Sequence, residues 1–377
     1  MLSICSPQLG LSPESNSGGE VYDREVINRL CQKNITIYTL LPKGRTYQKH
    51  DNLVVKFAAI RPMVPPHSFN AFVLPYLIKT YLTHRFDILR VHNPYFVGPA
   101  ALAFKAIFPK VPIVLSHLHT ETGINGFIDA FTLKKYDHII AISKSTKDEL
   151  HSDYHYPNSR ISVAYPGVST DFKPGSKSRP KADQPLAEKI TLLFLGGLKQ
   201  RKNPQFLLKL LAKLNNKNLK LVFAGTGPLL SELKNLTNSL NLSDQVTFTG
   251  FIKEKDKVKI YQSVDILLLP SLKEGFGMTI TEAAACGVPS IGADHYSIKE
   301  IIKDQKTGLL AKPNDLQDWS EKLLQLIKAP KLRQKMGQEA RVHVLKTFSW
   351  DKNIETHIKL FNQLAKKVRP LRTDLFG

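Results

Sequence analysis

The sequence predicts an α/β protein of two domains, each built on a parallel β-sheet with helices on its faces. Short apolar runs alternate with longer helical patterns along the chain, which is the order of βαβ units. The length of 377 residues exceeds what one ordinary core accommodates. Residues 171–185, rich in Pro, Lys, Ser and Gly, separate two sets of strands and are typical of an exposed linker.

The expected strands form two groups. The first group covers residues 1–5, 35–41, 88–91, 113–116 and 138–142, and the second covers residues 191–195, 220–224, 246–249, 266–269 and 289–291. After residue 312 the pattern is helical to residue 367. We therefore expect a first domain over residues 1–185 that ends in a linker at about 171–187, a second domain over residues 188–350, and a C-terminal helix and tail over residues 351–377.

One stretch, residues 271–292, carries most of the functional information. Its sequence is SLKEGFGMTITEAAACGVPSIG, and an apolar strand precedes it. Gly275 and Gly277 allow positive φ and a close approach of the backbone to a ligand. The helix expected from about Met278 directs its unpaired N–H groups and its positive dipole end to the same place. This arrangement suits a diphosphate.

Two acidic residues flank the start of this helix. Glu274 lies before it and Glu282 about one turn inside it, so the two carboxylates can face one cleft and bind different parts of one ligand. Carboxylates accept hydrogen bonds from the hydroxyls of a sugar or a ribose, and each charge-assisted bond contributes about 1.5–3 kcal/mol. A glycine-rich strand-to-helix turn is also common in parallel α/β proteins, and an acid near a helix start is favourable to the dipole alone. Residue chemistry by itself leaves both interpretations open.

The string EGFG followed by TEAAACGVP resembles the signature of the family 4 retaining glycosyltransferases, glycosyltransferase group 1. Further resemblance extends over nearly the whole chain, through segments 17–20, 111–119, 139–143, 161–167, 192–198, 221–227 and 246–252. It implies the GT-B fold, in which two Rossmann-like domains with parallel sheets face each other across a cleft and the C-terminal helix crosses back to the first domain. It also implies that the first domain binds the acceptor and the second binds the nucleotide sugar.

The resemblance implies roles for residues of this sequence. Glu274 would position the transferred sugar, Glu282 the ribose and Lys202 the phosphate, while His119 would lie near the transferred sugar. We expect Glu274, His119 and Lys202 to be catalytic. The expected donor-binding residues, which include a glycine loop in the first domain and backbone donors after Glu274, are Gly18, Gly19, Gly196, Gly197, Arg201, Lys202, Phe251, Ile252, Glu274, Gly275, Phe276, Gly277, Met278 and Glu282.

The sequence departs from the family pattern at two positions. Gly197 stands where most relatives have arginine, and Pro166 stands where an asparagine is usual. The first departure removes a cation from the phosphate site. Arg201, next to Lys202, can supply the missing charge, although a solvated basic turn is an equally good interpretation of this residue.

The sequence suggests neither a metal nor a cofactor. No Asp-x-Asp pair occurs at the end of an expected strand to bridge a diphosphate through a metal, so we expect metal-independent catalysis in which side-chain cations and helix N–H groups meet the charge of the leaving nucleotide. The three cysteines, Cys5, Cys31 and Cys286, form no closely spaced framework, which favours a reducing compartment and argues against zinc.

The net charge of +21 supports a different interpretation, a protein that binds polyanions. Both parts of the chain are basic, with 22 Lys and Arg against 14 Asp and Glu up to Pro185 and 31 against 18 after it. No helix-turn-helix, zinc-finger or base-stacking pattern accompanies this charge, which argues against nucleic acid as the partner. Attraction to an anionic membrane or to phosphorylated substrates fits better.

The segment 69–85, FNAFVLPYLIKTYLTHR, is more apolar than a half-exposed helix requires and ends in basic residues. Contact with a membrane surface would explain it, and so would a helix that packs on the first sheet and is kinked at Pro75. The sequence has no secretory signal and no run of about eighteen apolar residues, so we expect a cytoplasmic protein, with peripheral contact at the inner face of the membrane as a further option.

These observations predict a metal-independent, retaining glycosyltransferase of polysaccharide biosynthesis. It would transfer a hexosyl unit from a nucleotide-diphosphate sugar, with UDP or GDP as the carrier, to a hydroxyl of a glycan or lipid-linked acceptor. The alternatives are a polyanion-binding or membrane-binding protein and a GT-B enzyme of another chemistry, an epimerase or a phosphorylase. The base, the sugar, the acceptor and the oligomeric state do not follow from these residues.

Overall fold

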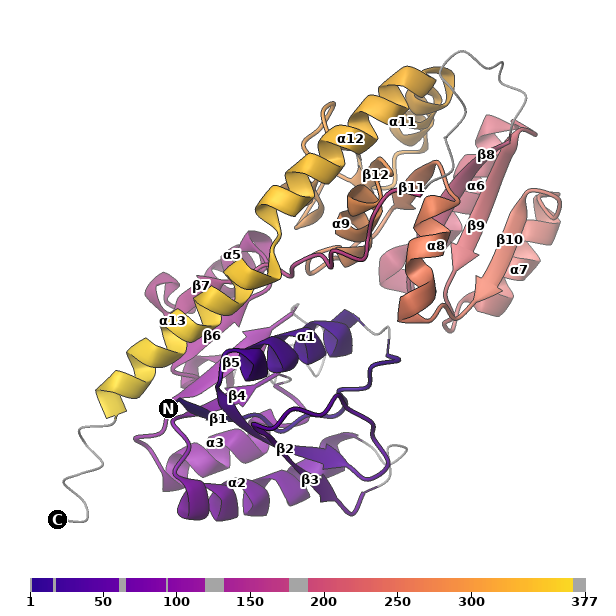
Figure 1. Cartoon of the computed structure of the whole chain (residues 1–377). Helices are drawn as coiled ribbons and strands as arrows, with labels where there is room; N and C mark the ends of the chain where they lie inside the picture. Colours follow the sequence, from indigo (N-terminus) through magenta and orange to yellow (C-terminus); the bar gives the residue numbers. More distant parts are fainter. Residues whose placement is uncertain are drawn as a thin grey trace. The chain divides into compact units, whose positions relative to one another are not determined.

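The structure is a computed structural model that describes residues 2–15, 18–60, 66–92, 94–118, 132–175 and 189–368. The chain forms two compact units, one made of Met1–Pro166 with Trp350–Gly377 and the other of Gly167–Ser349 (Figure 1). Each unit has one parallel sheet with helices on its faces, so the predicted fold class is confirmed. Residues 176–188, most of the expected linker, lie outside the described residues.

The first unit is built on a seven-stranded sheet in the order β3-β2-β1-β4-β5-β6-β7, and every pairing is parallel. Its strands are β1 Ser3–Cys5, β2 Thr36–Pro42, β3 Leu53–Ala58, β4 Ile88–Val91, β5 Ile113–His117, β6 His138–Ala141 and β7 Ile161–Val163. Five of these strands were expected from the sequence, and β3 and β7 were not. Both are edge strands, and edge strands lack the continuous apolar run of a strand buried on both faces.

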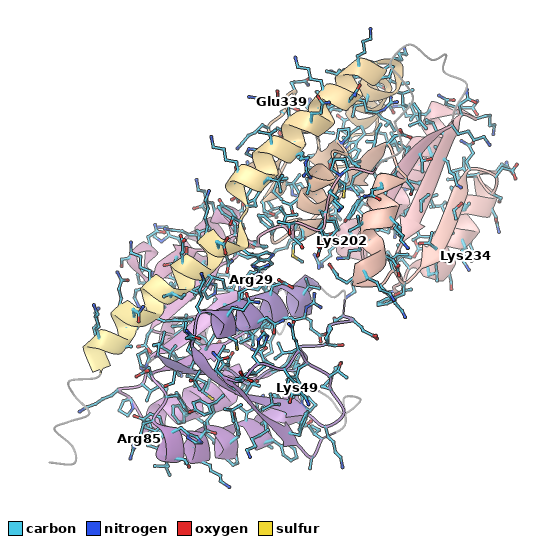
Figure 2. All side chains as sticks on the ribbon, viewed as in Figure 1. Arg29, Lys49, Arg85, Lys202, Lys234 and Glu339 are labelled. Carbon is cyan, nitrogen blue, oxygen red and sulfur yellow. The ribbon has the colours of Figure 1, made fainter. Side chains whose placement is uncertain are left out.

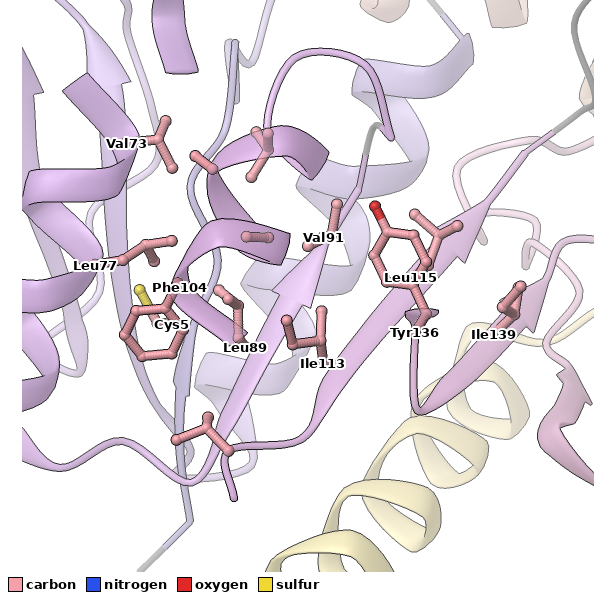
Figure 3. Close-up of a cluster of buried hydrophobic side chains, with 14 of the residues drawn as sticks. Cys5, Val73, Leu77, Leu89, Val91, Phe104, Ile113, Leu115, Tyr136 and Ile139 are labelled. Carbon is pink, nitrogen blue, oxygen red and sulfur yellow. The ribbon is translucent and has the colours of Figure 1, made fainter. Parts of the chain in front are cut away.

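The helices of this unit cover both faces of the sheet (Figure 1). They are α1 Gly18–Gln32, α2 Asn70–His84, α3 Gly98–Ile107, α5 Lys144–Ser152 and α13 Trp350–Val368, with 3-10 turns η1 Pro66–Phe69, η2 Leu133–Lys135 and η3 Asn158–Arg160. A buried apolar cluster lies between the sheet and α2 and α3, where Leu77 and Phe104 meet Leu89 and Ile113 (Figure 3). Full burial of such a side chain contributes about 1.5–3 kcal/mol, so this cluster holds the layer together.

The helix α13 joins the end of the chain to the first unit. The Asn353 side chain donates to the carbonyls of Ala164, at 3.0 Å, and Tyr165, at 2.8 Å. On α1, the Arg29 guanidinium lies 5.6 Å from the centroid of the Trp350 ring. These contacts satisfy the N–H donors of a buried amide and cover an aromatic ring with a cation, which ties α13 to this unit.

The second unit has a six-stranded parallel sheet in the order β10-β9-β8-β11-β12-β13. Its strands are β8 Ile190–Leu195, β9 Leu219–Ala224, β10 Val246–Gly250, β11 Ile266–Leu269, β12 Ser290–Ala293 and β13 Gly308–Ala311. Its helices are α6 Pro204–Leu214, α7 Leu230–Ser239, α8 Lys257–Gln262, α9 Met278–Ala285, α10 Ile298–Ile301, α11 Leu316–Lys328 and α12 Pro330–Thr347, with η4 Gln200–Lys202 and η5 Glu254–Asp256. The five expected strands form, and β13 was missed. The region expected to be helical after residue 312 divides into α11, α12 and α13.

Candidate functional site

The strand order of the second sheet places a topological switch point between β8 and β11, where the succession of strands reverses. In open parallel sheets, ligands bind beyond the carboxyl ends of the strands at such a point. The loops that leave these two strands are residues 196–203 and 270–277, and they carry Lys202 and Glu274. Lys202 lies at this edge of the second unit (Figure 2).

Glycine permits the close approach of the loops that follow β8 and β9. Gly225 has φ +151°, and a Cβ atom at this position would lie 1.9 Å from the carbonyl oxygen of Gly196. A Cβ atom on Gly227 would lie 2.4 Å from the carbonyl oxygen of Leu198. No side chain fits at either position, so these glycines keep the backbone at the edge of the sheet compact and accessible.

A backbone hydrogen bond and a side-chain hydrogen bond join the loops after β8 and β11. The carbonyl of Arg201 accepts a hydrogen bond from the amide of Leu272 at 2.8 Å. In return, the exposed Arg201 guanidinium donates through Nη1 to the carbonyl of Lys273 at 3.2 Å. Asn203, which precedes α6, adopts a left-handed conformation with φ +53° and turns the chain into that helix. These hydrogen bonds between the two loops place Lys202 opposite Glu274.

The Lys202 ammonium forms an ion pair with Glu274 Oε2. Both side chains are largely buried, at 14% and 10% exposure, and the Ser271 hydroxyl also donates to Glu274 Oε2 at 3.3 Å. Burial by itself would raise the pKa of Glu274, but the charges of Lys202 and Arg201 outweigh it and hold that pKa below its usual value. The carboxylate is therefore ionised at neutral pH.

The turn after Glu274 is fixed from a neighbouring loop. Gly277 has φ +99° and starts α9, a left-handed conformation that glycine adopts without strain. The buried Ser297 hydroxyl lies 3.0 Å from the carbonyl of Glu274 and 2.9 Å from that of Phe276. The ring of Phe276 is buried against Phe348. The first-turn N–H groups of α9 thus have a defined direction next to the ion pair.

Glu282, the second predicted carboxylate, belongs to a different cluster. Its Oε2 accepts from the Tyr261 hydroxyl at 2.7 Å, and its Oε1 lies 3.3 Å from the Lys257 ammonium, which also contacts Glu254 at 2.9 Å. Burial raises the pKa of Glu282 above its usual value, while the nearby Lys257 opposes that shift. The described contacts therefore place Glu274 and Glu282 in two separate polar clusters of the same unit.

The remaining predicted residues lie at several places. Gly196 and Gly197 follow β8, Phe251 and Ile252 follow β10, and Phe251 is 52% exposed. Gly275 and Met278 flank the turn that starts α9. In the first unit, Gly18 and Gly19 start α1. His119 lies outside the described residues.

A second polar cluster, which the sequence analysis did not predict, lies at the corresponding switch point of the first sheet, between β1 and β4. Buried Arg90 and Asp23 form an ion pair at 2.5 Å, and the His92 Nδ1 atom lies 3.2 Å from the same carboxylate oxygen. A Cβ atom on Gly19 would lie 3.7 Å from His92 Nε2. Gly19, at the start of α1, therefore adjoins a charged cluster. The position of His92 directly after β4, at the carboxyl end of that strand, was the sequence signal that could have indicated this cluster.

The sequence analysis also missed His295, which follows β12. Both ring nitrogens of His295 are buried. Burial lowers the pKa of this imidazole, while the Ser271 backbone and the carboxylates of Asp294 and Glu274 act in the opposite direction. The position of this polar residue just after β12, the strand that pairs with β11, was the sequence signal that could have indicated it.

Neither a metal-binding cluster nor a membrane-spanning helix occurs in the described part of the chain. It contains no group of three His, Cys, Asp or Glu side chains arranged to hold a metal ion. None of its helices is both long enough and apolar enough to cross a bilayer.

Comparisons with known proteins agree over both units. Residues 16–172 match the family model Glycosyltransferase Family 4, and residues 177–343 match the model Glycosyl transferases group 1. The D-inositol 3-phosphate glycosyltransferase of Arthrobacter sp. strain FB24 is 32% identical over 292 residues, which cover 71% of this chain and 68% of that protein. The protein of the same name from Mycobacteroides abscessus is 28% identical over 66% of this chain, and the match spans only 57% of its own length.

Two solved structures resemble the whole fold. Sucrose-phosphate synthase from Thermosynechococcus elongatus superposes with a TM-score of 0.82 at 17% identity, covering 97% of this chain and 99% of that one. HepE from Anabaena, in complex with UDP and glucose, superposes with a TM-score of 0.79 at 15% identity, covering 96% of this chain and all of that one. At these identities the likeness establishes the GT-B fold. Together with the family models and the relative from Arthrobacter, it shows that this chain belongs to the family 4 glycosyltransferases.

Proposed function

We propose that this chain is a retaining glycosyltransferase that transfers a hexosyl unit from a nucleotide-diphosphate sugar to a hydroxyl of a glycan or lipid-linked acceptor. The ion pair between Lys202 and Glu274 at the switch point of the second sheet carries the proposal. It puts a cation for phosphate and an anion for sugar hydroxyls side by side, next to the start of α9. HepE, which shares the fold, has been crystallised with UDP and with UDP-glucose.

The donor would lie along this edge of the second unit. Lys202, Arg201 and the first-turn N–H groups of α9 would meet the charge that develops on the leaving diphosphate. Glu274 would accept hydrogen bonds from the transferred sugar. The ribose and the base would extend toward Glu282 and Phe251, and Glu282 would exchange one of its present partners for a ribose hydroxyl.

The first unit would bind the acceptor, and the leaving diphosphate would take the acceptor's proton. The acceptor would bind near the Gly18-Gly19 start of α1, and His119 would lie near the transferred sugar. Retention follows if the acceptor hydroxyl attacks on the face that the diphosphate leaves, so that a phosphate oxygen takes the acceptor's proton.

Three buried free cysteines are in keeping with a reducing, cytoplasmic location.

A panel of UDP-, GDP- and ADP-sugars tests the proposal. A ligand at 100 times its dissociation constant stabilises the native state by about 2.7 kcal/mol, so the cognate donor is expected to raise the melting temperature clearly. The donor that does so is then tested for transfer to acceptor mixtures. If no nucleotide sugar stabilises or reacts, and DNA or heparin binds with steep salt dependence, the chain is a polyanion-binding protein. Conversion of the donor sugar to its epimer without an acceptor would indicate an epimerase, and cleavage of a glycan by inorganic phosphate would indicate a phosphorylase.

Transfer is expected to persist in EDTA. The positive charges of Lys202 and Arg201, together with the N–H groups of α9, are proposed to stabilise the leaving diphosphate without a divalent cation. Initial rates with and without EDTA, and with added Mg²⁺ or Mn²⁺, provide the measurement. Loss of activity in EDTA that either cation restores would show that the charge assignment is wrong.

We also propose that the outer face of α2 docks on an anionic membrane. Phe72 and Leu82 project from this face with exposures of 39% and 55%, while the opposite face of α2 packs on the core. Val54, 36% exposed, lies on the same side of the sheet, because it pairs with Tyr38, whose ring stacks on His84 of α2. Between residues 43 and 85 the sequence contains seven Lys and Arg and one Asp, so this stretch of the chain carries a net positive charge. Arg85 marks the end of α2 (Figure 2).

A Phe72→Ser/Leu82→Ser double variant is expected to bind vesicles of mixed phosphatidylcholine and phosphatidylglycerol at least about tenfold more weakly than the wild type, because two apolar side chains no longer enter the lipid. Binding of the wild type should weaken with salt and with neutral vesicles. Val342→Ser on α12, which removes a side chain that is 66% exposed in the other unit, is the matched control. Equal binding by all three proteins, or none by the wild type, would contradict the assignment.

A further inference from the structure

The loop that follows β12 lies beside the loop that carries Glu274. Strands β11 and β12 are parallel neighbours, with Leu269 opposite Gly292. The loops that follow these two strands therefore leave the sheet at the same edge (Figure 1). The Ser297 hydroxyl then reaches the carbonyls of Glu274 and Phe276. The loop after β12 is therefore part of the wall around Glu274.

This loop is held in an unfavourable conformation. Tyr296 has φ +47°, in the left-handed region that bulky L residues rarely adopt. Its ring packs edge-on against the ring of His295, with centroids 4.6 Å apart and planes at 85°. Such strain persists where the surrounding structure enforces it, and it concentrates at functional sites.

His295 has hydrogen-bonding capacity that the protein does not use. Neither Nδ1 nor Nε2 has a hydrogen-bond partner of good geometry among the described residues, although both atoms are buried. Buried polar atoms are almost always paired, so an imidazole that the Ser271 backbone beside it does not fully satisfy indicates a place where a ligand group completes the set. The nearby polar groups are the Ser271 backbone and the Asp294 and Glu274 carboxylates, with Lys299 as the neighbouring cation.

We propose that His295 is a donor-binding residue, whose imidazole hydrogen-bonds a hydroxyl of the transferred sugar next to the hydroxyl that Glu274 binds. This inference rests on the proposed function, because it requires the sugar of a nucleotide-diphosphate donor at Glu274. A neutral imidazole presents one N–H donor and one acceptor nitrogen, which matches a sugar hydroxyl. Burial lowers the pKa of His295 and keeps the ring neutral at pH 7. Glu274 and His295 together then bind two hydroxyls of the same sugar and select among hexoses.

Two variants separate the polar role from a packing role. His295→Phe keeps a ring against Tyr296 and removes both nitrogens, while His295→Asn restores a polar side chain. With the donor found in the screen, His295→Phe is expected to lower kcat/KM roughly tenfold, and His295→Asn to recover part of that loss. Inhibition by the nucleoside diphosphate alone should be unchanged in both variants, because this ligand lacks the sugar.

Monodeoxy derivatives of the donor locate the contact. In the wild type, removal of the hydroxyl that His295 binds should lower kcat/KM roughly tenfold, and in His295→Phe the same removal should have almost no further effect. Removal of the other hydroxyls should affect both proteins equally. Equal losses at every position in both proteins, unchanged kcat/KM in His295→Phe, or weaker binding of the nucleoside diphosphate would each overturn the inference. These outcomes presuppose turnover of a donor, so they differ from failure of the proposed function, in which no donor reacts.

Discussion

Replacement of Lys202 by alanine is expected to lower kcat/KM by a hundredfold or more. Two or three negative charges accumulate on the leaving diphosphate, and Gly197 removes the arginine that the family usually contributes to this site. Lys202 is the buried cation at the switch point, and the loss of one preorganised donor from such a site costs about 2.7–4 kcal/mol of transition-state stabilisation. The change also leaves Glu274 without its ion-pair partner, which adds to the loss of donor binding.

Two neighbouring variants calibrate this result. Lys199→Ala removes an exposed lysine three residues earlier in the same loop and should leave kcat/KM unchanged. Arg201→Ala should give a smaller but clear loss, because the guanidinium donates to the carbonyl of Lys273 and adds positive charge at Glu274. Steady-state kinetics with the identified donor, and melting temperatures to confirm folding, provide the measurement. A wild-type rate for Lys202→Ala would remove the phosphate role from this loop.

Much of the architecture was predictable from the sequence because parallel strands buried on both faces are continuous apolar runs. Residues 266–269, Ile-Leu-Leu-Leu, are such a run and form β11 as expected. The missed strand β3, LVVKFA, has a lysine in its centre and three exposed positions, because it lies at an edge of the sheet. The pattern of this edge strand does not differ enough from that of a loop to be predicted.

The candidate site was partly predictable for a related reason. The resemblance to the family implied that Lys202 and Glu274 act together, and the structure pairs them, although the two residues are 72 positions apart. Spacing along α9 could not reveal that Glu282 turns to Tyr261 and Lys257, since both partners come from α8. His295 lies in no motif that the sequence analysis used. Only the pairing of β12 with β11 brings its loop to Glu274.

The second large effect is expected for Glu274→Gln, which should fold but lose about a hundredfold or more in kcat/KM. Glutamine keeps the shape of the side chain and an oxygen that can accept from Lys202 and Ser271, so the loop is retained. The negative charge is lost, and with it the charge-assisted hydrogen bonds to the sugar, each of about 1.5–3 kcal/mol. Glu282→Ala should instead chiefly weaken donor binding. Glu321→Gln, at an exposed position on α11 in the same unit, should leave kcat/KM unchanged.

The pH dependence of stability separates the charge of Glu274 from its shape. Because its pKa is lower in the folded protein than its usual value, ionised Glu274 contributes stability above the unfolded pKa, and that contribution is lost as the pH falls through the folded value. Glu274→Gln should therefore melt below the wild type at pH 7, and the gap should close in acid, at pH values below the ordinary glutamate pKa of about 4.3. A gap that is constant with pH would show that shape, and not charge, stabilises the loop. Wild-type turnover in this variant would show that the sugar lies elsewhere, because a neutral amide cannot replace a carboxylate that accepts from a sugar hydroxyl without loss.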